Sequence, residues 1–466
     1  MPLPKPRVAA LRKLYHPHHP NQMLDQALIL LFEKPHSFTG QDLIELQCHG
    51  SRAVIQGLLE VLPSSLTENT SDVITNSGNT QQDYSSAVRM AEPGEFTQRA
   101  FANGKLDLVQ VEALADILSA DTSSQLQQAL QQLDGRLSEV YDSWREQLIS
   151  GLAHAEAVID FGDDERLGVD DLLDDDSAQW NVWGTVTTRM EGLAKSMKRH
   201  LADDRRGEIV RQGVQIAIVG PPNAGKSSLF NVLARQDAAI VSPIAGTTRD
   251  VLTISLDLGG VKCTLKDTAG VRNATEDSLE WEGIQRARQV AHQADLIVAM
   301  VDATDVSRGM ETVQSVLNDR NEFESKQFLL VFNKLDLLNN KSYHHNDHIL
   351  RFEQTFEISC LTQEGIDTLL EALTRKVVDR TQSLNDGDPA SSYEGALITR
   401  ARHRQHVQAA TEALDRFHVL SQQGTLAVDM AAEELRLAAS ELGRITGAVD
   451  VEDILDVLFR DFCIGK

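Results

Sequence analysis

The chain has 466 residues, of which 41% are hydrophobic and 24% charged, a composition typical of a globular protein with buried cores. Its longest apolar stretches are far shorter than the ~20 residues that a membrane-spanning helix needs. Asp and Glu outnumber Lys and Arg by 69 to 44, and the net charge of −25 argues against a general polyanion binder, although a local basic surface stays open. The four cysteines form no C-x-x-C pair, so neither a disulfide framework nor a zinc site is encoded.

Residues 1–105 contain strand-like and turn-like pieces, and we expect an α+β domain there. The first 24 residues carry basic side chains and no acid, but their prolines and their lack of Ser and Thr fit a transit peptide poorly. A polar run at residues 67–86 has too few apolar side chains to fold by itself, so we expect a surface insertion.

From residue 106 the pattern changes to that of helices. Apolar residues recur at alternating steps of four and three, which predicts one apolar stripe along a single long helix; they are Leu126, Leu130, Leu133, Leu137, Val140 and Trp144. An acidic stretch at residues 163–176 interrupts the pattern and indicates a solvated loop rather than a metal site. More helix is expected to about residue 206.

Between residues 213 and 380 short apolar strands alternate with helical segments. The strands are expected at 214–219, 261–265, 296–301, 328–332 and 356–358. This alternation is typical of βαβ units and a mostly parallel sheet. After a polar linker, helix resumes to the C-terminus, which favours an α/β domain inserted into an all-α one. The helices before and after the insertion are expected to pack together.

A phosphate-binding motif lies directly after the first of these strands. Residues 220–227 read Gly-Pro-Pro-Asn-Ala-Gly-Lys-Ser and match G-x-x-x-x-G-K-S between a strand and a helix, which is the context this motif requires. The glycines let backbone N–H groups surround phosphates at a helix N-terminus. Lys226 is expected at the β- and γ-phosphates, and the Ser227 hydroxyl at Mg²⁺. Alone, the pattern also occurs as a chance glycine-rich turn.

Four further motifs follow in the order of a GTPase. Asp267-Thr268-Ala269-Gly270 follows a strand, where a carboxylate can hold the Mg²⁺ shell and a glycine can approach the γ-phosphate. Asn333-Lys334-Leu335-Asp336 ends in a carboxylate that can accept the N1–H and 2-amino donors of guanine, which adenine lacks. Ser359-Cys360-Leu361 suits a backbone contact to the guanine carbonyl. Gly246-Thr-Thr-Arg-Asp250 lies between the first helix and the second strand, with Thr248 as the expected second hydroxyl on Mg²⁺. The five elements together predict a GTPase.

The residues expected to contact GTP are Asn223, Ala224, Gly225, Lys226, Ser227, Ser228, Ser242, Thr247, Thr248, Asp267, Thr268, Ala269, Gly270, Asn333, Lys334, Asp336, Ser359, Cys360 and Leu361.

These motifs lack two residues that assist GTP hydrolysis in other GTPases, so other groups must take their place. Val271 stands where many small GTPases carry the Gln that orients water, and the phosphate loop contains no Arg. Asn223, with backbone carbonyls of Ser242 and Ile244, could coordinate a monovalent cation that neutralises charge in the transition state. Glu280 could orient the water, and the alternative is that it is an exposed acid in the first turn of a helix.

The chain resembles the MnmE (TrmE) family, GTPases that modify wobble uridines in tRNA of bacteria and mitochondria. The likeness covers nearly the whole chain. It includes residues 35–50, residues 93–108 (beginning Pro-Gly-Glu-Phe-Thr), Asp160-Phe161, and Leu-Gly-Arg-Ile-Thr-Gly at 442–447. The terminal Phe-Cys-Ile-Gly-Lys at 462–466 is the most family-specific segment, because other GTPases with similar motifs lack it.

The resemblance implies four segments. A tetrahydrofolate-binding and dimerisation domain is expected at residues 1–105, shortened at its start because the chain begins where the family has Pro-Arg-x-Ala. The first half of the helical domain is expected at 106–212, a potassium-dependent G domain at 213–380, and the second helical half at 381–466. The expected fold is therefore an α/β P-loop GTPase domain inserted into an all-α domain and preceded by an α+β folate-binding-like domain.

The resemblance also implies site residues. Glu45, Lys105 and Lys466 match folate contacts, and Ser227 and Thr248 match Mg²⁺ ligands. The catalytic residues implied are Glu280, which orients water, Lys226, and Cys463, whose thiolate is implicated in uridine chemistry. Taken as single residues, Lys105 and Lys466 also fit solvated surface charges. Cys463 also fits a small apolar side chain. The implied potassium ligands are Asn223, Ser242, Ile244 and Thr247. A basic cluster is a candidate tRNA surface or a solvated helix face; it comprises Arg400, Arg402, His403 and Arg404.

The implied activity is GTP-driven attachment of a folate one-carbon unit to C5 of a wobble uridine, which gives a carboxymethylaminomethyl-type group. The implied cofactors are GTP, Mg²⁺, K⁺ and a tetrahydrofolate derivative, with FAD only in an MnmG-type partner. The implied partners are tRNA and a second copy of the chain, and the expected location is the mitochondrial matrix or, alternatively, a bacterial cytoplasm. The rival hypothesis is a ribosome-assembly or regulatory switch GTPase whose flanking domains only bind partners.

Overall fold

The computed structural model describes residues 3–67, 89–162, 178–203, 205–236, 238–240, 253–267, 279–317, 326–338, 354–382, 398–423 and 427–449. The chain divides into two compact units. Met1–Ala115 and Thr446–Lys466 form the first unit, and Asp116–Ile445 forms the second. The polar run expected as an insertion, apart from Thr67, and the acidic stretch at 163–176 lie outside the described residues.

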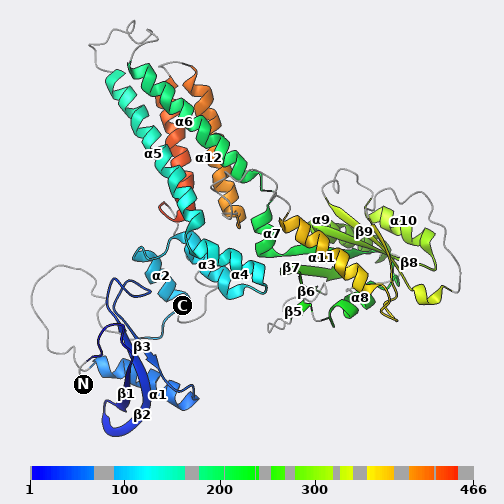
Figure 1. Cartoon of the computed structure of the whole chain (residues 1–466), viewed down its shortest axis with the longest axis horizontal. Coiled ribbons are helices and arrows are strands. Elements are labelled where there is room, and N and C mark those ends of the chain that lie inside the picture. Colours follow the sequence, from blue (N-terminus) through cyan, green and yellow to red (C-terminus); the bar gives the residue numbers. More distant parts are fainter. Residues whose placement is uncertain are drawn as a thin grey trace, which may run out of the picture. The chain divides into compact units, whose positions relative to one another are not determined.

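The first unit contains a three-stranded antiparallel sheet in the order β1-β2-β3 (Figure 1). Its strands are β1 (Ala10–His16), β2 (His19–Phe32) and β3 (Leu43–Gln47). The strand-like pieces expected here are thus present. Sequence reasoning missed the helices α1 (Arg52–Thr67) and α2 (Glu95–Ala102). α3 (Leu108–Ser119) begins close to where helix was expected, and its Leu108, Val109 and Val111 are fully buried.

The α/β part of the second unit is built on a seven-stranded sheet in the order β10-β9-β8-β4-β7-β6-β5. β4 (Val214–Val219), β7 (Val261–Asp267), β8 (Leu296–Asp302), β9 (Gln327–Asn333) and β10 (Gln354–Glu357) run parallel. β6 (Thr253–Leu258) and the short β5 (Ala239–Ile240) are antiparallel. The predicted mostly parallel sheet is confirmed.

Helices cover both faces of this sheet because alternate side chains of its strands point to opposite faces. Ile216 and Ile218 of β4 share one core cluster with α8 (Lys226–Leu233) and α11 (Ile366–Gln382). Ala217 and Val219 share the other with α9 (Leu279–Gln293) and α10 (Val306–Val316). Strands buried on both faces explain the continuous apolar runs in the sequence.

The predicted single long helix over residues 126–144 is wrong. The segment forms two helices, α4 (Ser123–Leu133) and α5 (Arg136–Gly162), separated at Gly135, whose φ of +87° is incompatible with a continuing helix. Leu126 and Leu130 are exposed, whereas Leu137 and Trp144 of α5 are fully buried. The apolar stripe therefore belongs to α5 alone.

The helices on either side of the α/β part lie side by side in a bundle (Figure 1). α5 and α6 (Ala178–Leu201) precede it in the chain, and α12 (Ala401–Ser421) and α13 (Val428–Thr446) follow it. Trp183 of α6 stacks against Phe417 of α12 with ring centroids 5.8 Å apart. The short α7 (Arg206–Gln212) leads into β4. In the part of the chain that the structure describes, no helix has the length and apolarity needed to cross a membrane.

Candidate nucleotide site

The phosphate-binding motif follows β4, the strand at which the connections to the next strands begin to run to opposite sides of the sheet. β4 has β7 on one side and β8 on the other, so the connections that leave neighbouring strands diverge at its carboxyl end. In parallel sheets ligands bind in the crevice at such a point. The loop at residues 220–225 follows β4 there and leads into α8.

Two glycines of this loop have no room for a side chain. Gly220 has φ +155°, and a Cβ built on it would lie 2.1 Å from the carbonyl oxygen of Met300. Gly225 has φ +98°, and its Cβ would lie 2.1 Å from Nδ2 of Asn333. Asn223 between them also adopts a positive φ, +62°. The loop therefore curls tightly against β8 and β9, with its backbone free to approach phosphates.

Lys226 is the first residue of α8 and is 7% exposed. Its Nζ donates to the carbonyl oxygens of Gly220 at 2.8 Å and Pro221 at 2.7 Å. The ammonium thus lies inside the curl of the loop, at the helix N-terminus, where anions are favoured. Ser227 and Ser228 follow on the first turn and are exposed. The structure brings together the loop residues predicted for phosphate binding.

Asn333 connects the phosphate loop to the predicted base-binding loop. It is 2% exposed, and its Nδ2 donates to the carbonyl oxygen of Ala224 at 2.9 Å. Its Oδ1 accepts from the backbone N–H of Cys360 at 3.1 Å. Burial raises the pKa of the Cys360 thiol to about 11, with Asp336 adding to the shift, so the sulfur stays protonated near neutral pH.

Asp336 lies opposite the loop that follows β10. The buried Ser359 hydroxyl donates to its Oδ1 at 2.5 Å and itself accepts from the N–H of Thr362 at 3.2 Å. Leu361 is 82% exposed beside this loop. One hydroxyl therefore holds this carboxylate in place, and because the side chain is otherwise exposed its remaining lone pairs can still accept hydrogen bonds.

Sequence reasoning missed Asp302, the last residue of β8. Its Oδ2 pairs with Nζ of Lys334 at 2.6 Å, and its Oδ1 accepts from the N–H and hydroxyl of Thr304. Burial raises the pKa of Asp302, but the hydrogen bonds from Lys334 and Thr304 outweigh it and lower that pKa overall. The pair holds Lys334, whose φ is +72°, beside Asn333. The only sequence signal was a carboxylate at the end of a central strand.

Part of the predicted metal and water machinery lies outside the described residues: Ser242, Ile244, Thr247, Thr248, Thr268, Ala269 and Gly270. Asp267 ends β7 and is paired in register with Ile218, which places its backbone next to the start of the phosphate loop. Glu280 is the second residue of α9. The exposed hydroxyl of Ser227, on the first turn of α8, is of a ligand type that suits Mg²⁺.

The predicted folate residues are not brought together by any described contact. Glu45 is exposed on β3, where it pairs in register with Leu30. Lys105 is also exposed, and its Nζ donates to the carbonyl oxygen of Pro35 at 3.2 Å. Lys466 and Cys463 lie outside the described residues.

The basic cluster at the start of α12 is not a solvated helix face. Arg400 donates to Asp116 at 2.8 Å, and Arg402 donates to the carbonyl oxygen of Arg444 at 2.8 Å. Arg404 pairs with Glu208 and Asp203, and His403 is fully buried. Acids distant in sequence thus bind the guanidinium groups of Arg400 and Arg404, and a backbone carbonyl oxygen binds that of Arg402, while the hypothesis of a tRNA surface here stays a prediction.

Comparison with known proteins covers the whole chain. Two family models match, "MnmE helical domain" over residues 108–463 and "GTP-binding protein TrmE N-terminus" over residues 2–105. The mitochondrial 5-taurinomethyluridine tRNA synthase subunit GTPB3 of Danio rerio is 41% identical over 474 residues, which cover 100% of this chain and 86% of the relative. The human protein of the same name is 42% identical with the same coverage. The tRNA modification GTPase MnmE of Parvibaculum lavamentivorans is 43% identical over 99% of this chain and 91% of its own.

Proposed function

The chain belongs to the MnmE (TrmE) family of tRNA modification GTPases, and from this premise we propose that it uses GTP hydrolysis to drive modification of C5 of a wobble uridine. The observation that carries the GTPase half is the double hydrogen bond of Asn333, which joins the phosphate loop to the loop beside Asp336. One rigid site can thereby select guanine and hold its triphosphate.

In this proposal each described residue has a defined task. Asp336 accepts the N1–H and 2-amino group of guanine, and a nucleotide without these donors would leave its carboxylate unpaired. Lys226 neutralises the β- and γ-phosphates while the N–H groups of the α8 N-terminus bind their oxygens. Ser227 and Asp267 would hold Mg²⁺, which lowers the charge on the phosphate oxygens during transfer to water.

A potassium ion is proposed to supply the positive charge that an arginine provides in other GTPases. Asn223 is the described side chain that would contact it, and its positive φ turns the backbone of the phosphate loop outward at that position. Ser242, Ile244 and Thr247 complete the proposed ligand set, and Glu280 would orient the water. Replacing K⁺ by Na⁺ should slow GTP hydrolysis at least about tenfold, and an equal rate in Na⁺ would remove this assignment.

The uridine chemistry is proposed to use a one-carbon unit from a tetrahydrofolate bound by Glu45, Lys105 and Lys466, with Cys463 as a thiolate near the uridine. An FAD-dependent MnmG-type protein would supply the redox step, and the chain would act as a homodimer. Equilibrium dialysis with 5-formyl-tetrahydrofolate tests the folate part directly. Binding by the intact protein that Lys105→Ala weakens supports it, whereas no binding excludes it.

The location is proposed to be the mitochondrial matrix, with a bacterial cytoplasm as the alternative. GTPB3 relatives are mitochondrial by name, and bacterial MnmE proteins match about equally well. A fluorescent fusion of the protein in its own cells distinguishes the two.

Nucleoside analysis of tRNA tests the proposed function as a whole. Cells that lack the protein should accumulate wobble uridine without its C5 substituent, and the wild-type protein should restore the modification. Lys226→Ala should fail to restore it, because the phosphates lose their cation. Normal wobble uridines in the deleted strain would instead favour the rival, a ribosome-assembly or switch GTPase.

A further inference from the structure

The hairpin of β6 and β7 reaches from the nucleotide site to the far edge of the sheet. β6 begins at Thr253, three residues after Asp250, and β7 ends at Asp267, the first residue of the Asp-Thr-Ala-Gly motif. Both outer ends of the hairpin therefore lie at the nucleotide edge. Its turn, at Gly259 and Gly260, lies at the opposite end, about 20 Å away for strands of this length.

That turn is closed by a hydrogen bond of its own and contacts the start of helix α4. The N–H of Gly260 donates to Oδ1 of Asp257 at 2.7 Å, which closes the turn from within. The carbonyl oxygen of Gly260 accepts the N–H of Ser124 at 3.3 Å, one of the N–H groups at the start of α4. Lys262, two residues further, pairs with Asp121 at 2.7 Å. A displacement of the hairpin along its axis thus acts directly on the N-terminus of α4.

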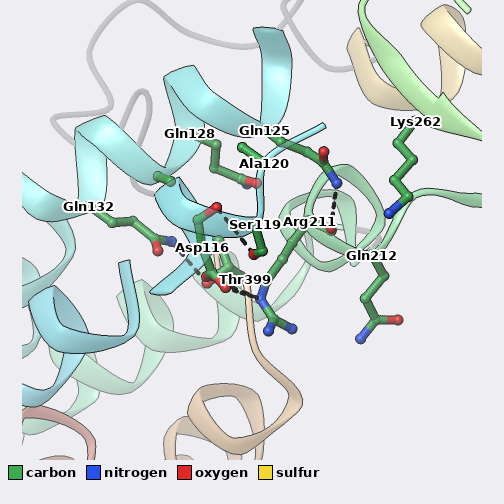
Figure 2. Close-up of a pocket in the computed structure, with 11 residues that line it drawn as sticks. Asp116, Ser119, Ala120, Gln125, Gln128, Gln132, Arg211, Gln212, Lys262 and Thr399 are labelled. Atoms are coloured by element: carbon green, nitrogen blue, oxygen red, sulfur yellow. Dashed lines mark hydrogen bonds and ion pairs between the residues drawn. The ribbon is translucent and has the colours of Figure 1, made fainter. Parts of the chain in front are cut away.

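α4 in turn holds the polypeptide on both sides of the α/β part. Three glutamines on its buried or half-buried face each donate across the junction, and Figure 2 shows the bonds of Gln125 and Gln132. Gln125 donates to the carbonyl oxygen of Arg211 at 2.8 Å and Gln128 to that of Gly207 at 3.3 Å, both on α7 before β4. Gln132 donates to the hydroxyl of Thr399, just before α12, at 2.9 Å.

Asp116, at the end of α3, binds the same two connections. Nε of Arg211 donates to both of its oxygens, at 3.0 and 3.1 Å, and Nη2 of Arg400 donates to Oδ1 at 2.8 Å. Its carboxylate is 13% exposed. One charged group thus fastens the chain where it enters and where it leaves the α/β part.

A polar cavity of about 300 Å³ lies among these groups. Figure 2 shows Gln125, Gln128, Gln132, Arg211 and Lys262 around it. Protein interiors are close-packed elsewhere, and apolar packing of that kind resists displacement. Here the contacts are hydrogen bonds of long side chains beside open space, which resist a displacement of α4 less than close apolar packing would.

We propose that the contact between the β6–β7 turn and α4 transmits the nucleotide state to the helical bundle, with Lys262 and Asp121 as positioning residues for GTP-dependent tRNA modification. The inference rests on the proposed function only for the second measurement below, the level of wobble-uridine modification. Neither residue touches the nucleotide site. Their partial exposure, 24% and 36%, means that substitutions are compatible with folding.

Amide hydrogen exchange over Ser123–Leu133 of the full-length protein is the direct test, measured with GDP and with a non-hydrolysable GTP analogue. In the wild type the analogue should change the exchange rate of α4 amides about fivefold or more. Lys262→Met keeps the aliphatic stem, and it and Asp121→Asn should each abolish that difference. Lys262→Arg should retain it, and the double variant should be no worse than either single one.

The matched control is Lys198→Met, which breaks the ion pair between Lys198 of α6 and Asp415 of α12, 2.6 Å apart within the bundle. It should leave the response of α4 unchanged. An α4 that does not respond in the wild type, or a response that survives in Lys262→Met, overturns the proposal.

The second readout separates hydrolysis from modification. Lys262→Met and Asp121→Asn should hydrolyse GTP within about twofold of the wild-type rate but lower wobble-uridine modification about fivefold or more. An equal loss of both activities would contradict a coupling role. A wild-type protein that leaves tRNA unmodified while α4 responds as expected would refute the proposed function and leave the coupling standing.

Discussion

Nδ2 of Asn333 lies 2.9 Å from the carbonyl oxygen of Ala224, so a side chain at the end of β9 is bonded to a loop that lies 109 residues earlier in the chain. The same amide accepts the N–H of Cys360 through Oδ1. Buried at 2% exposure, Asn333 holds these two loops together.

Asn333→Asp should weaken GTP binding by roughly 10- to 100-fold. The substitution keeps an oxygen for the N–H of Cys360 but places a second oxygen against the carbonyl of Ala224, where a donor is needed. Titration of the protein with a fluorescent GTP analogue measures the effect. A dissociation constant within about twofold of wild type would show that the bond to Ala224 does not organise the site.

Gly225→Ala should abolish GTP binding, because its Cβ would collide with Nδ2 of Asn333 and its φ of +98° is strained for any L-residue. The matched control is Gly192→Ala in α6, where nothing lies within 4 Å of the added Cβ. That control should bind GTP normally and melt at the same or a slightly higher temperature, since Ala favours the helix by ~0.5–1 kcal/mol. Equal GTP affinity of Gly225→Ala and wild type would refute the tight-loop argument.

Asp336→Asn should shift base preference from guanine to xanthine. The side-chain amide can donate to the 2-oxo group of xanthine, whereas the 2-amino group of guanine would face a donor. GTP affinity should fall about 100-fold or more and XTP affinity should rise, as competition binding would show. Unchanged preference would mean that Asp336 does not contact the base.

Glu95→Gln should make the first unit less sensitive to acid. A hydrogen bond from the N–H of Glu92, with further bonds from Arg99 and Arg89, outweighs burial and lowers the pKa of Glu95 from 4.5 to about 2. Because the folded pKa is depressed, the stabilisation is fully present above pH 4.5 and is lost as the pH falls toward 2. In wild type the exchange rate of α2 amides, divided by the intrinsic rate at each pH, should rise as the pH falls from 4.5 toward 2.

The Glu95→Gln variant should exchange faster than wild type at pH 6, because charge-assisted bonds of ~1.5–3 kcal/mol are lost, and its pH dependence should be flatter. Parallel curves for the two proteins would show that Glu95 does not control acid stability there.

Much of the α/β part could be predicted because its signals are local. Apolar runs gave the five parallel strands to within a few residues, although β5 and β6 were missed. The phosphate loop needs only neighbouring residues with the right backbone freedom. The coupling of Asn333, Cys360 and Ala224 could not be predicted, since spacing in the sequence does not reveal which loops meet at a sheet edge. Asp302 was missed for the same reason.

The helical part was predicted less well. Apolar residues recur at steps of three and four throughout residues 126–144. Such a pattern does not reveal a break between two helices, and Gly135 separates α4 from α5. The apolar leucines of α4 were read as its buried face, whereas its glutamines face the junction with α7 and Thr399.

The order of motifs along the chain by itself identified a GTPase, because the phosphate-binding motif and the Asn-Lys-x-Asp motif are short contiguous segments. Only the tertiary structure decided what its charged residues do. Arg400 and Arg404 formed a basic run in the sequence, yet folding supplies Asp116, Asp203 and Glu208 from some 200 to 280 residues away. Whether a charge is free to bind a partner depends on such distant neighbours, and these are set by packing rather than by sequence spacing.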